Sequence, residues 1–237
     1  MKKYLSIFIL VSLAFSNDYS ILFTKQFIST PGEFEAGISR VGKTGDEDTH
    51  KYYMNFRYGL TPNLEIVYPG IKYRFLHTPN DEAAVMLKLN EYGEDTLDDT
   101  IYRVEGGLLN RYHLDESLIL DVAVLYEHKF AEIYKDDYNY KFLINPAWDY
   151  RPNIRIGIRG VFSEAYSFEK DAIDTIWEMY QKNSQIGPML SYYFDNDVDV
   201  SIGYSAQNKT YRIKENGAAR EYETYINNYI LDVRWRF

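Results

Sequence analysis

The 237-residue chain contains no cysteine, so its fold uses no disulfide. Beyond residue 16 it also lacks an apolar run of about 18 residues, which excludes a transmembrane helix. Positive charge is scarce, because 26 Lys and Arg stand against 35 Asp and Glu and the formal net charge is −9. This balance argues against a nucleic-acid-binding protein, whose surface would be basic. No glycine-rich phosphate loop and no zinc-spaced ligand set is visible.

The N-terminus has the pattern of an export signal. Lys2 and Lys3 precede a short apolar stretch, residues 4–13, and Ala14-Phe15-Ser16 is a small-x-small cleavage sequence. We therefore predict a signal peptide over residues 1–16, cleaved near Ser16. Residues 17–32 form a lead-in segment, in which residues 20–23, Ser-Ile-Leu-Phe, could pair as a strand or lie inside the barrel. Residues 33–237 form the main domain.

The last stretch of the chain alternates strictly between two kinds of residue. One face of a strand over residues 229–237 would be apolar and aromatic, and the other almost wholly charged. The apolar face consists of Tyr229, Leu231, Val233, Trp235 and Phe237. This ending resembles the C-terminal signature of Gram-negative outer-membrane β-barrels, in which a terminal Phe follows apolar residues at alternate positions. The resemblance implies that these five residues are the signal read by the barrel assembly machinery.

The same alternation continues through most of the chain. It predicts an all-β fold, a transmembrane antiparallel up-and-down β-barrel in the bacterial outer membrane. Three-residue turns alternate with longer polar loops, and the parity of these connections favours twelve strands, with ten or fourteen as alternatives. This count takes Pro69-Gly70 as a hairpin turn; the alternative is a bulge in one long strand. The 24 tyrosines are typical of interfacial aromatic girdles, although cross-strand pairs would also use them.

Several strand ends follow from the pattern. We expect strands at 33–41, 184–194, 198–207 and 223–237, among others. Between residues 167 and 183, Ile173, Ile176, Trp177 and Tyr180 have helical spacing, which suits a short amphipathic helix in the barrel mouth or on the membrane surface. The alternative is a longer strand pair that projects above the membrane.

Charged residues fall on the inward face of the expected strands. The candidate lumen and selectivity residues are Arg57, Arg103, Glu105, Arg111, Asp121, Glu127, Lys141, Arg155, Arg159, Asp232 and Arg234. Mixed signs are expected where charges share a low-dielectric interior, since they must be paired. The arginines Arg103, Arg111, Arg155 and Arg159 lie on neighbouring strands and could instead form one basic stripe that selects anionic solutes.

Residues 113–117, His-Leu-Asp-Glu-Ser, contain the residue types of a catalytic triad, but they lie at a tight turn and residue types alone make no triad. His50 beside Asp46, Glu47 and Asp48 has ligand types for a metal, although such loops are more often only solvated. We therefore predict no catalytic residue, no metal and no cofactor.

The favoured function is a passive channel or small porin for small polar or anionic solutes. An outer-membrane phospholipase or protease is one alternative, and a structural or surface-binding barrel with a closed, salt-bridged lumen is another. The expected partners are outer-membrane lipid and lipopolysaccharide, the barrel assembly machinery and small anionic solutes, but no nucleic acid.

Overall fold

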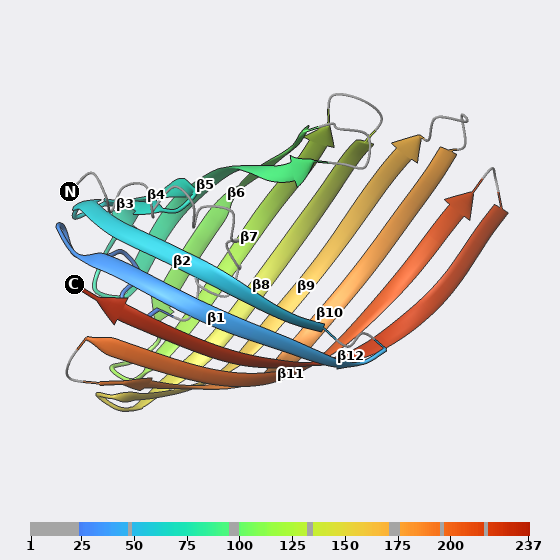
Figure 1. Cartoon of the computed structure of the whole chain (residues 1–237). Helices are drawn as coiled ribbons and strands as arrows, with labels where there is room; N and C mark the ends of the chain where they lie inside the picture. Colours follow the sequence, from blue (N-terminus) through green and yellow to red (C-terminus); the bar gives the residue numbers. More distant parts are fainter. Residues whose placement is uncertain are drawn as a thin grey trace.

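The computed structural model describes residues 24–46, 49–94, 100–131, 135–170, 176–194, 197–215 and 218–237. These form a closed antiparallel barrel in which each strand pairs with its neighbours in sequence and β1 pairs with β12 (Figure 1). The predicted all-β barrel and its count of twelve strands are confirmed. Among the described residues, no helix is long and apolar enough to cross a membrane.

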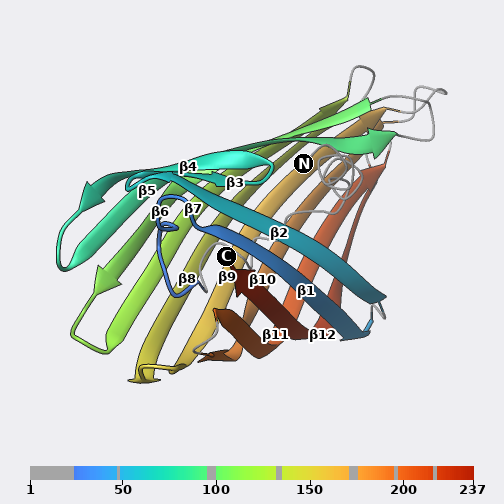
Figure 2. The ribbon, with the colours of Figure 1, turned by 60° about the vertical axis from the view of Figure 1, so that its left-hand side comes forward.

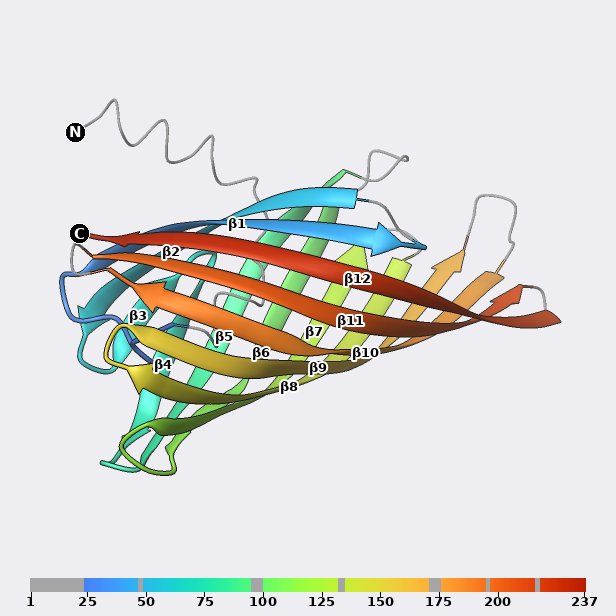
Figure 3. The same ribbon diagram turned by 90° about the horizontal axis from the view of Figure 1, so that it is seen from below.

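The strands differ greatly in length around the ring. Their bounds are β1 Phe34–Gly45, β2 Thr49–Thr61, β3 Leu64–Val67, β4 Gly70–His77, β5 Asp81–Glu94, β6 Thr100–His113, β7 Leu118–Ala131, β8 Lys135–Arg151, β9 Ile154–Lys170, β10 Ile176–Tyr193, β11 Val198–Glu215 and β12 Ala218–Arg236. Pro69-Gly70 does separate two short strands, of 4 and 8 residues, so the hairpin interpretation is confirmed. The strands β8 to β12 are 17 to 19 residues long, whereas β1 to β7 have 14 residues or fewer, so the wall is taller on that side (Figures 1 and 3).

The two ends of the barrel can be told apart by their connections. One end carries the turns at 62–63, 114–117 and 152–153 together with the β1–β12 closure, where Phe34 and Phe237 exchange two backbone hydrogen bonds. We call it the turn end and the opposite end the loop end. In outer-membrane barrels the short turns are periplasmic, which places the loop end outside the cell.

Alternation of exposure separates the two faces of the barrel wall. On β7, Leu118 and Val124 are exposed by 41% and 55%, whereas Asp121 and Leu125 are each exposed by only 1%. The other strands behave alike, so the exposed apolar side chains form a belt around the barrel while most charges lie inside. This arrangement suits a barrel in lipid and is the reverse of a soluble protein.

Two expectations for the loop end are wrong. Residues 176–180 continue β10 and pair with β9 and β11, so the helix predicted there does not form, and the alternative of a longer strand pair is correct. Residues 171–175 lie outside the described residues, as does the predicted signal peptide. β1, β11 and β12 also extend beyond their predicted loop ends, to Gly45, Glu215 and Ala218. Each added residue in a hairpin gains ladder hydrogen bonds, whereas a short isolated helix has a costly nucleus.

Candidate functional site: a plugged lumen with two charge clusters

Residues 24–29 lie inside the barrel at the turn end, and we call this segment the plug (Figure 2). Phe27, Ile28 and Ser29 are exposed by only 3%, 8% and 3%. Residues 30–32 are exposed and lead into β1, with Pro31 bridged to Gly59. Residues 20–23, for which two placements were left open, lie outside the described residues. Phe27 and Ile28 belong to one apolar cluster with side chains of the inner wall: Ala84, Met86, Leu109, Ala123, Leu125, Leu143, Val161 and Met189. The plug thus completes an apolar core within the lumen.

Cationic side chains of the wall hold the plug by its backbone. Arg111 donates from Nη2 to the Thr24 carbonyl oxygen at 3.1 Å and from Nη1 to the Lys25 carbonyl oxygen at 3.2 Å. Arg155 donates from Nη1 to the same Thr24 oxygen at 3.3 Å. The Phe27 carbonyl oxygen accepts from Arg57 Nη2 at 3.3 Å and also from Lys72 Nζ. These contacts satisfy plug carbonyls that are buried away from water.

Each of these cations also has a carboxylate partner. Glu65 accepts from Arg57 at 2.8 Å and lies 3.2 Å from Lys72 Nζ, and its Oε2 accepts the Ser29 backbone N–H at 2.7 Å. We use the name plug cluster for the plug and the side chains that hold it: Arg57, Glu65, Lys72, Arg111, Asp121, Asp149 and Arg155. Buried charges of this kind are tolerated only when they are paired and hydrogen-bonded.

The Arg111–Asp121 pair is a bidentate contact that is fully buried in the plug cluster. Arg111 Nε lies 2.7 Å from Asp121 Oδ1 and Nη2 lies 2.9 Å from Oδ2, so the contact is bidentate. The two residues are exposed by 2% and 1%. Removing either one would leave the other as a buried charge without its counter-ion.

A second cluster lies nearer the loop end, on β5 to β8. Lys141 Nζ lies 2.9 Å from Glu105 Oε2 and 2.8 Å from Glu127 Oε2. Arg103 contacts both carboxylates, at 3.1 Å and 2.5 Å. Lys88 lies 3.5 Å from Glu105, and Lys129 lies 3.3 Å from Glu127. In this outer charge cluster four cations share two carboxylates, so the named side chains carry a net charge of 4 − 2 = +2.

The eleven candidate lumen residues thus occupy four different settings. Arg57, Arg111, Asp121 and Arg155 belong to the plug cluster, and Arg103, Glu105, Glu127 and Lys141 belong to the outer charge cluster. Asp232 and Arg234 form a buried pair on β12 at 2.6 Å, with the Ser39 hydroxyl donating to Asp232. Arg159 is 5% exposed on the inner face of β9. The four arginines considered as one stripe do not act together, because Arg103 lies in one cluster while Arg111 and Arg155 lie in the other.

Sequence reasoning missed the apolar inner residues and part of both clusters. Leu109, Leu125 and Leu143 each occupy an inward position, which alternation alone reveals, but only the plug explains why that position is apolar. Glu65 and Lys72, exposed by 0% and 2%, also occupy inward positions that alternation with their apolar neighbours reveals. Lys88 follows the same inward alternation on β5 as Met86.

The turn at residues 113–117 is a polar turn. Ser117 donates its hydroxyl to Asp115 Oδ1 at 3.0 Å, and the Ser117 and Leu118 backbone N–H groups donate to the same oxygen, each at 2.7 Å. These backbone donors hold the pKa of Asp115 below its usual range. His113 Nε2 instead faces Glu82 Oε1 at 3.6 Å. The hydroxyl therefore points to a capping carboxylate and not to a histidine base.

The loop around His50 gives no metal centre in the described part of the chain. Glu47 and Asp48 lie outside the described residues. Within those that are described, no group of three or more His, Cys, Asp or Glu side chains is placed to hold a metal ion.

No protein-family model matches the chain, and no curated protein matches it. Solved structures do resemble the barrel. OmpT, an outer membrane protein of Vibrio cholerae, is 7% identical with a TM-score of 0.45, over 88% of this chain and 99% of that one. The outer membrane protease OmpT of Escherichia coli is 10% identical with a TM-score of 0.35, over 90% and 99% of the chains. The outer membrane channel DcaP of Acinetobacter baumannii is 8% identical with a TM-score of 0.32, over 90% and 100%.

Likenesses this weak assign no activity, since channels and a protease appear together among them. The chain's own architecture decides its class. A closed twelve-strand barrel with an exposed apolar belt and a charged interior is a β-barrel of the bacterial outer membrane.

Proposed function

We propose that the protein is a passive channel for small polar or anionic solutes, and that the plug closes it at the turn end. The observation that carries the proposal is the outer charge cluster, in which Lys88, Arg103, Lys129 and Lys141 surround Glu105 and Glu127 within the lumen. Lys129 and Arg103 are the most accessible members, with side chains exposed by 30% and 17%. An anion entering from the loop end would meet these cations before it met the plug.

The plug is held mainly through its backbone, which favours a closure that can be released. When the plug carbonyls move away, each cation that bound them keeps a carboxylate partner. The partner is Glu65 for Arg57 and Lys72, Asp121 for Arg111, and Asp149 for Arg155. Phe27 is the main side-chain anchor, because its ring centroid lies 4.4 Å from Lys72 Nζ and its side chain is buried in the apolar core. Loss of that ring should weaken closure more than it weakens the barrel wall.

Single-channel recording in planar bilayers tests the proposal. The wild-type protein should conduct rarely, and Phe27→Ala should raise the open probability by about tenfold or more. Phe56→Ala is the matched control, since Phe56 belongs to the outward face of β2, where its ring stacks on Phe34. Open channels should prefer anions, and Lys129→Glu should remove the preference by taking the named cluster from +2 to 0, whereas Lys214→Glu outside the lumen should not.

A structural barrel with a closed lumen is the second candidate, favoured by the apolar core that seals the interior around Phe27. Absence of conductance in both the wild type and Phe27→Ala, with both proteins folded, would move the assignment to this function.

A further inference from the structure

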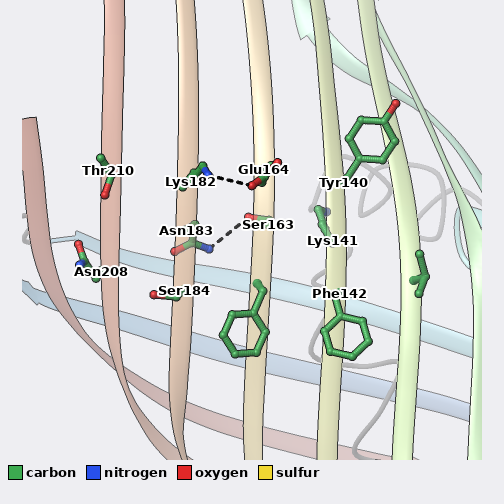
Figure 4. A pocket seen from close by; sticks show the side chains of 12 residues that line it. Tyr140, Lys141, Phe142, Ser163, Glu164, Lys182, Asn183, Ser184, Asn208 and Thr210 are labelled. Carbon is green, nitrogen blue, oxygen red and sulfur yellow. Dashed lines mark hydrogen bonds and ion pairs between the residues drawn. The ribbon is translucent and has the colours of Figure 1, made fainter. Parts of the chain in front are cut away.

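The outer surface of the barrel is hollowed where β8 to β11 leave the apolar belt (Figure 4). The depression has a volume of about 590 Å³. Its walls include the outward side chains of Tyr140, Phe142, Phe162, Glu164, Lys182, Ser184, Asn208 and Thr210. Lys141 points the other way, to Glu105 and Glu127, so near it the strand backbone forms the floor. The depression therefore faces lipid and not the lumen.

A second depression, of about 370 Å³, continues from the first. The two share Ser184 and Asn208, and the second extends past Ile186 and Ala206 to Tyr225 and Asn227 on β12. We call the combined feature the interface trough. Its length across six strands, β7 to β12, is suited to a ligand with more than one acyl chain.

The trough is divided into an apolar and a polar half. Toward the turn end it is lined by Val124, Phe142, Phe162 and Ile186, which belong to the exposed apolar belt. Toward the loop end the same strands present Glu164, Lys182 and Thr210. The trough thus follows the line where the outward residues change from apolar to polar, which is the level of lipid headgroups.

Short residues create the hollow. Ser184 pairs with Phe162 on one side and Asn208 on the other, and its side chain is smaller than both. Beside it, Gly160 has no side chain, and a Cβ there would lie 2.9 Å from Ile144 Cγ2 and 3.2 Å from Phe162 Cε2. The edge of the Phe162 ring therefore lies in the space that a side chain at residue 160 would fill.

The polar half offers both donors and acceptors. Lys182 Nζ lies 3.3 Å from Glu164 Oε1, and both side chains are more than half exposed, so the pair is open to an additional ligand. The side-chain oxygen of Asn208 is buried and has no hydrogen-bond partner within the described part of the chain. A buried acceptor without a donor is costly, and an occupant carrying hydroxyl or amide groups would satisfy it. The ammonium group of Lys182 would suit a phosphate.

We propose that the interface trough binds a phosphorylated glycolipid of the outer leaflet. Its acyl chains lie over Phe142, Phe162 and Ile186. Its sugar hydroxyl or amide groups donate to Asn208 Oδ1, and a phosphate oxygen accepts from Lys182. This site does not depend on the proposed channel, because it lies on the opposite face of the barrel wall.

Native mass spectrometry of the full-length folded protein in detergent provides the test. The probes are lipid A, the phosphorylated diglucosamine anchor of lipopolysaccharide, and phosphatidylglycerol, which has a phosphate but no sugar. Lipid A should bind at least about fivefold more tightly. Ser184→Phe, which fills the hollow, should weaken its binding about tenfold, and Lys182→Ala about fivefold.

Two matched controls should leave lipid A binding unchanged. Leu190→Phe adds a ring to the same strand outside the trough. Lys214→Ala removes the exposed cation that faces Glu178 at 3.3 Å, a pair like Lys182–Glu164 but outside the trough. Equal binding of the two lipids would overturn the glycolipid assignment. Equal effects of Lys182→Ala and Lys214→Ala would overturn the site, even if Ser184→Phe failed to fold.

Discussion

The plug cluster and the outer charge cluster use the same residue types in the same lumen, yet they are built differently. In the plug cluster every cation has a carboxylate partner and a backbone carbonyl of the plug, beside an apolar core. In the outer charge cluster two carboxylates are shared by four cations, and two of those cations reach solvent. The first arrangement holds a structure together, whereas the second keeps charged groups where solvent, and therefore a solute, can reach them.

The largest effect is expected in the plug cluster. Arg111→Ala would leave Asp121, which is 1% exposed, without its bidentate partner and would free the Lys25 carbonyl, while the Thr24 carbonyl would keep Arg155. Breaking a buried pair in this way costs about 3–5 kcal/mol in the free energy of unfolding. Urea unfolding in lipid vesicles, followed by tryptophan fluorescence, measures it. Arg212→Ala on an exposed position of β11 is the control and should change stability by less than about 0.5 kcal/mol.

A charge on the lipid face should have the next largest effect. Val124 is 55% exposed within the apolar belt, and Val124→Arg should cost about 2–4 kcal/mol if that exposure is to lipid. The same unfolding experiment applies, with Val124→Leu as the control. If Val124→Arg were as stable as the wild type, the assignment of the lipid-facing and lumen-facing residues would be inverted. The two charge clusters would then not share a lumen, and the comparison between them would not hold.

Loss of one cation from the outer charge cluster should cost least. In Lys141→Ala, Glu105 keeps Lys88 and Arg103, and Glu127 keeps Arg103 and Lys129. The expected loss of stability is about 1.5–3 kcal/mol, the scale of a hydrogen bond to a charged group. The unfolding curves of Lys141→Ala and Arg111→Ala should be measured side by side. Equal losses of stability would contradict the difference between the two clusters.

Much of the wall could be predicted from the sequence, because successive residues of a strand face opposite sides. The apolar Val124 faces lipid and the charged Glu127 faces the lumen, so the residue types reveal the two sides. The turn at Pro69-Gly70 was predictable from its residues. The loop ends of β10 to β12 were not, since outward residues such as Lys182 and Thr210 become polar above the membrane and the apolar signal disappears.

The contents of the lumen could not be predicted for a different reason. Alternation places Leu109 and Arg111 on the inner face but does not say what they meet there. Their partner is the plug, nearly a hundred residues earlier in the chain, and nothing in its short sequence marks Phe27 as a core residue.

Access of a charged thiol reagent to the lumen tests the central claim most directly. The chain has no cysteine, so a single introduced cysteine reports on one position. With reagent added to the folded protein in sealed vesicles from the loop end, Lys129→Cys should react at least about a hundredfold faster than Ser29→Cys, because Ser29 is 3% exposed within the plug. Comparable rates at the two positions would contradict a lumen closed by its own N-terminal segment below an accessible charge cluster.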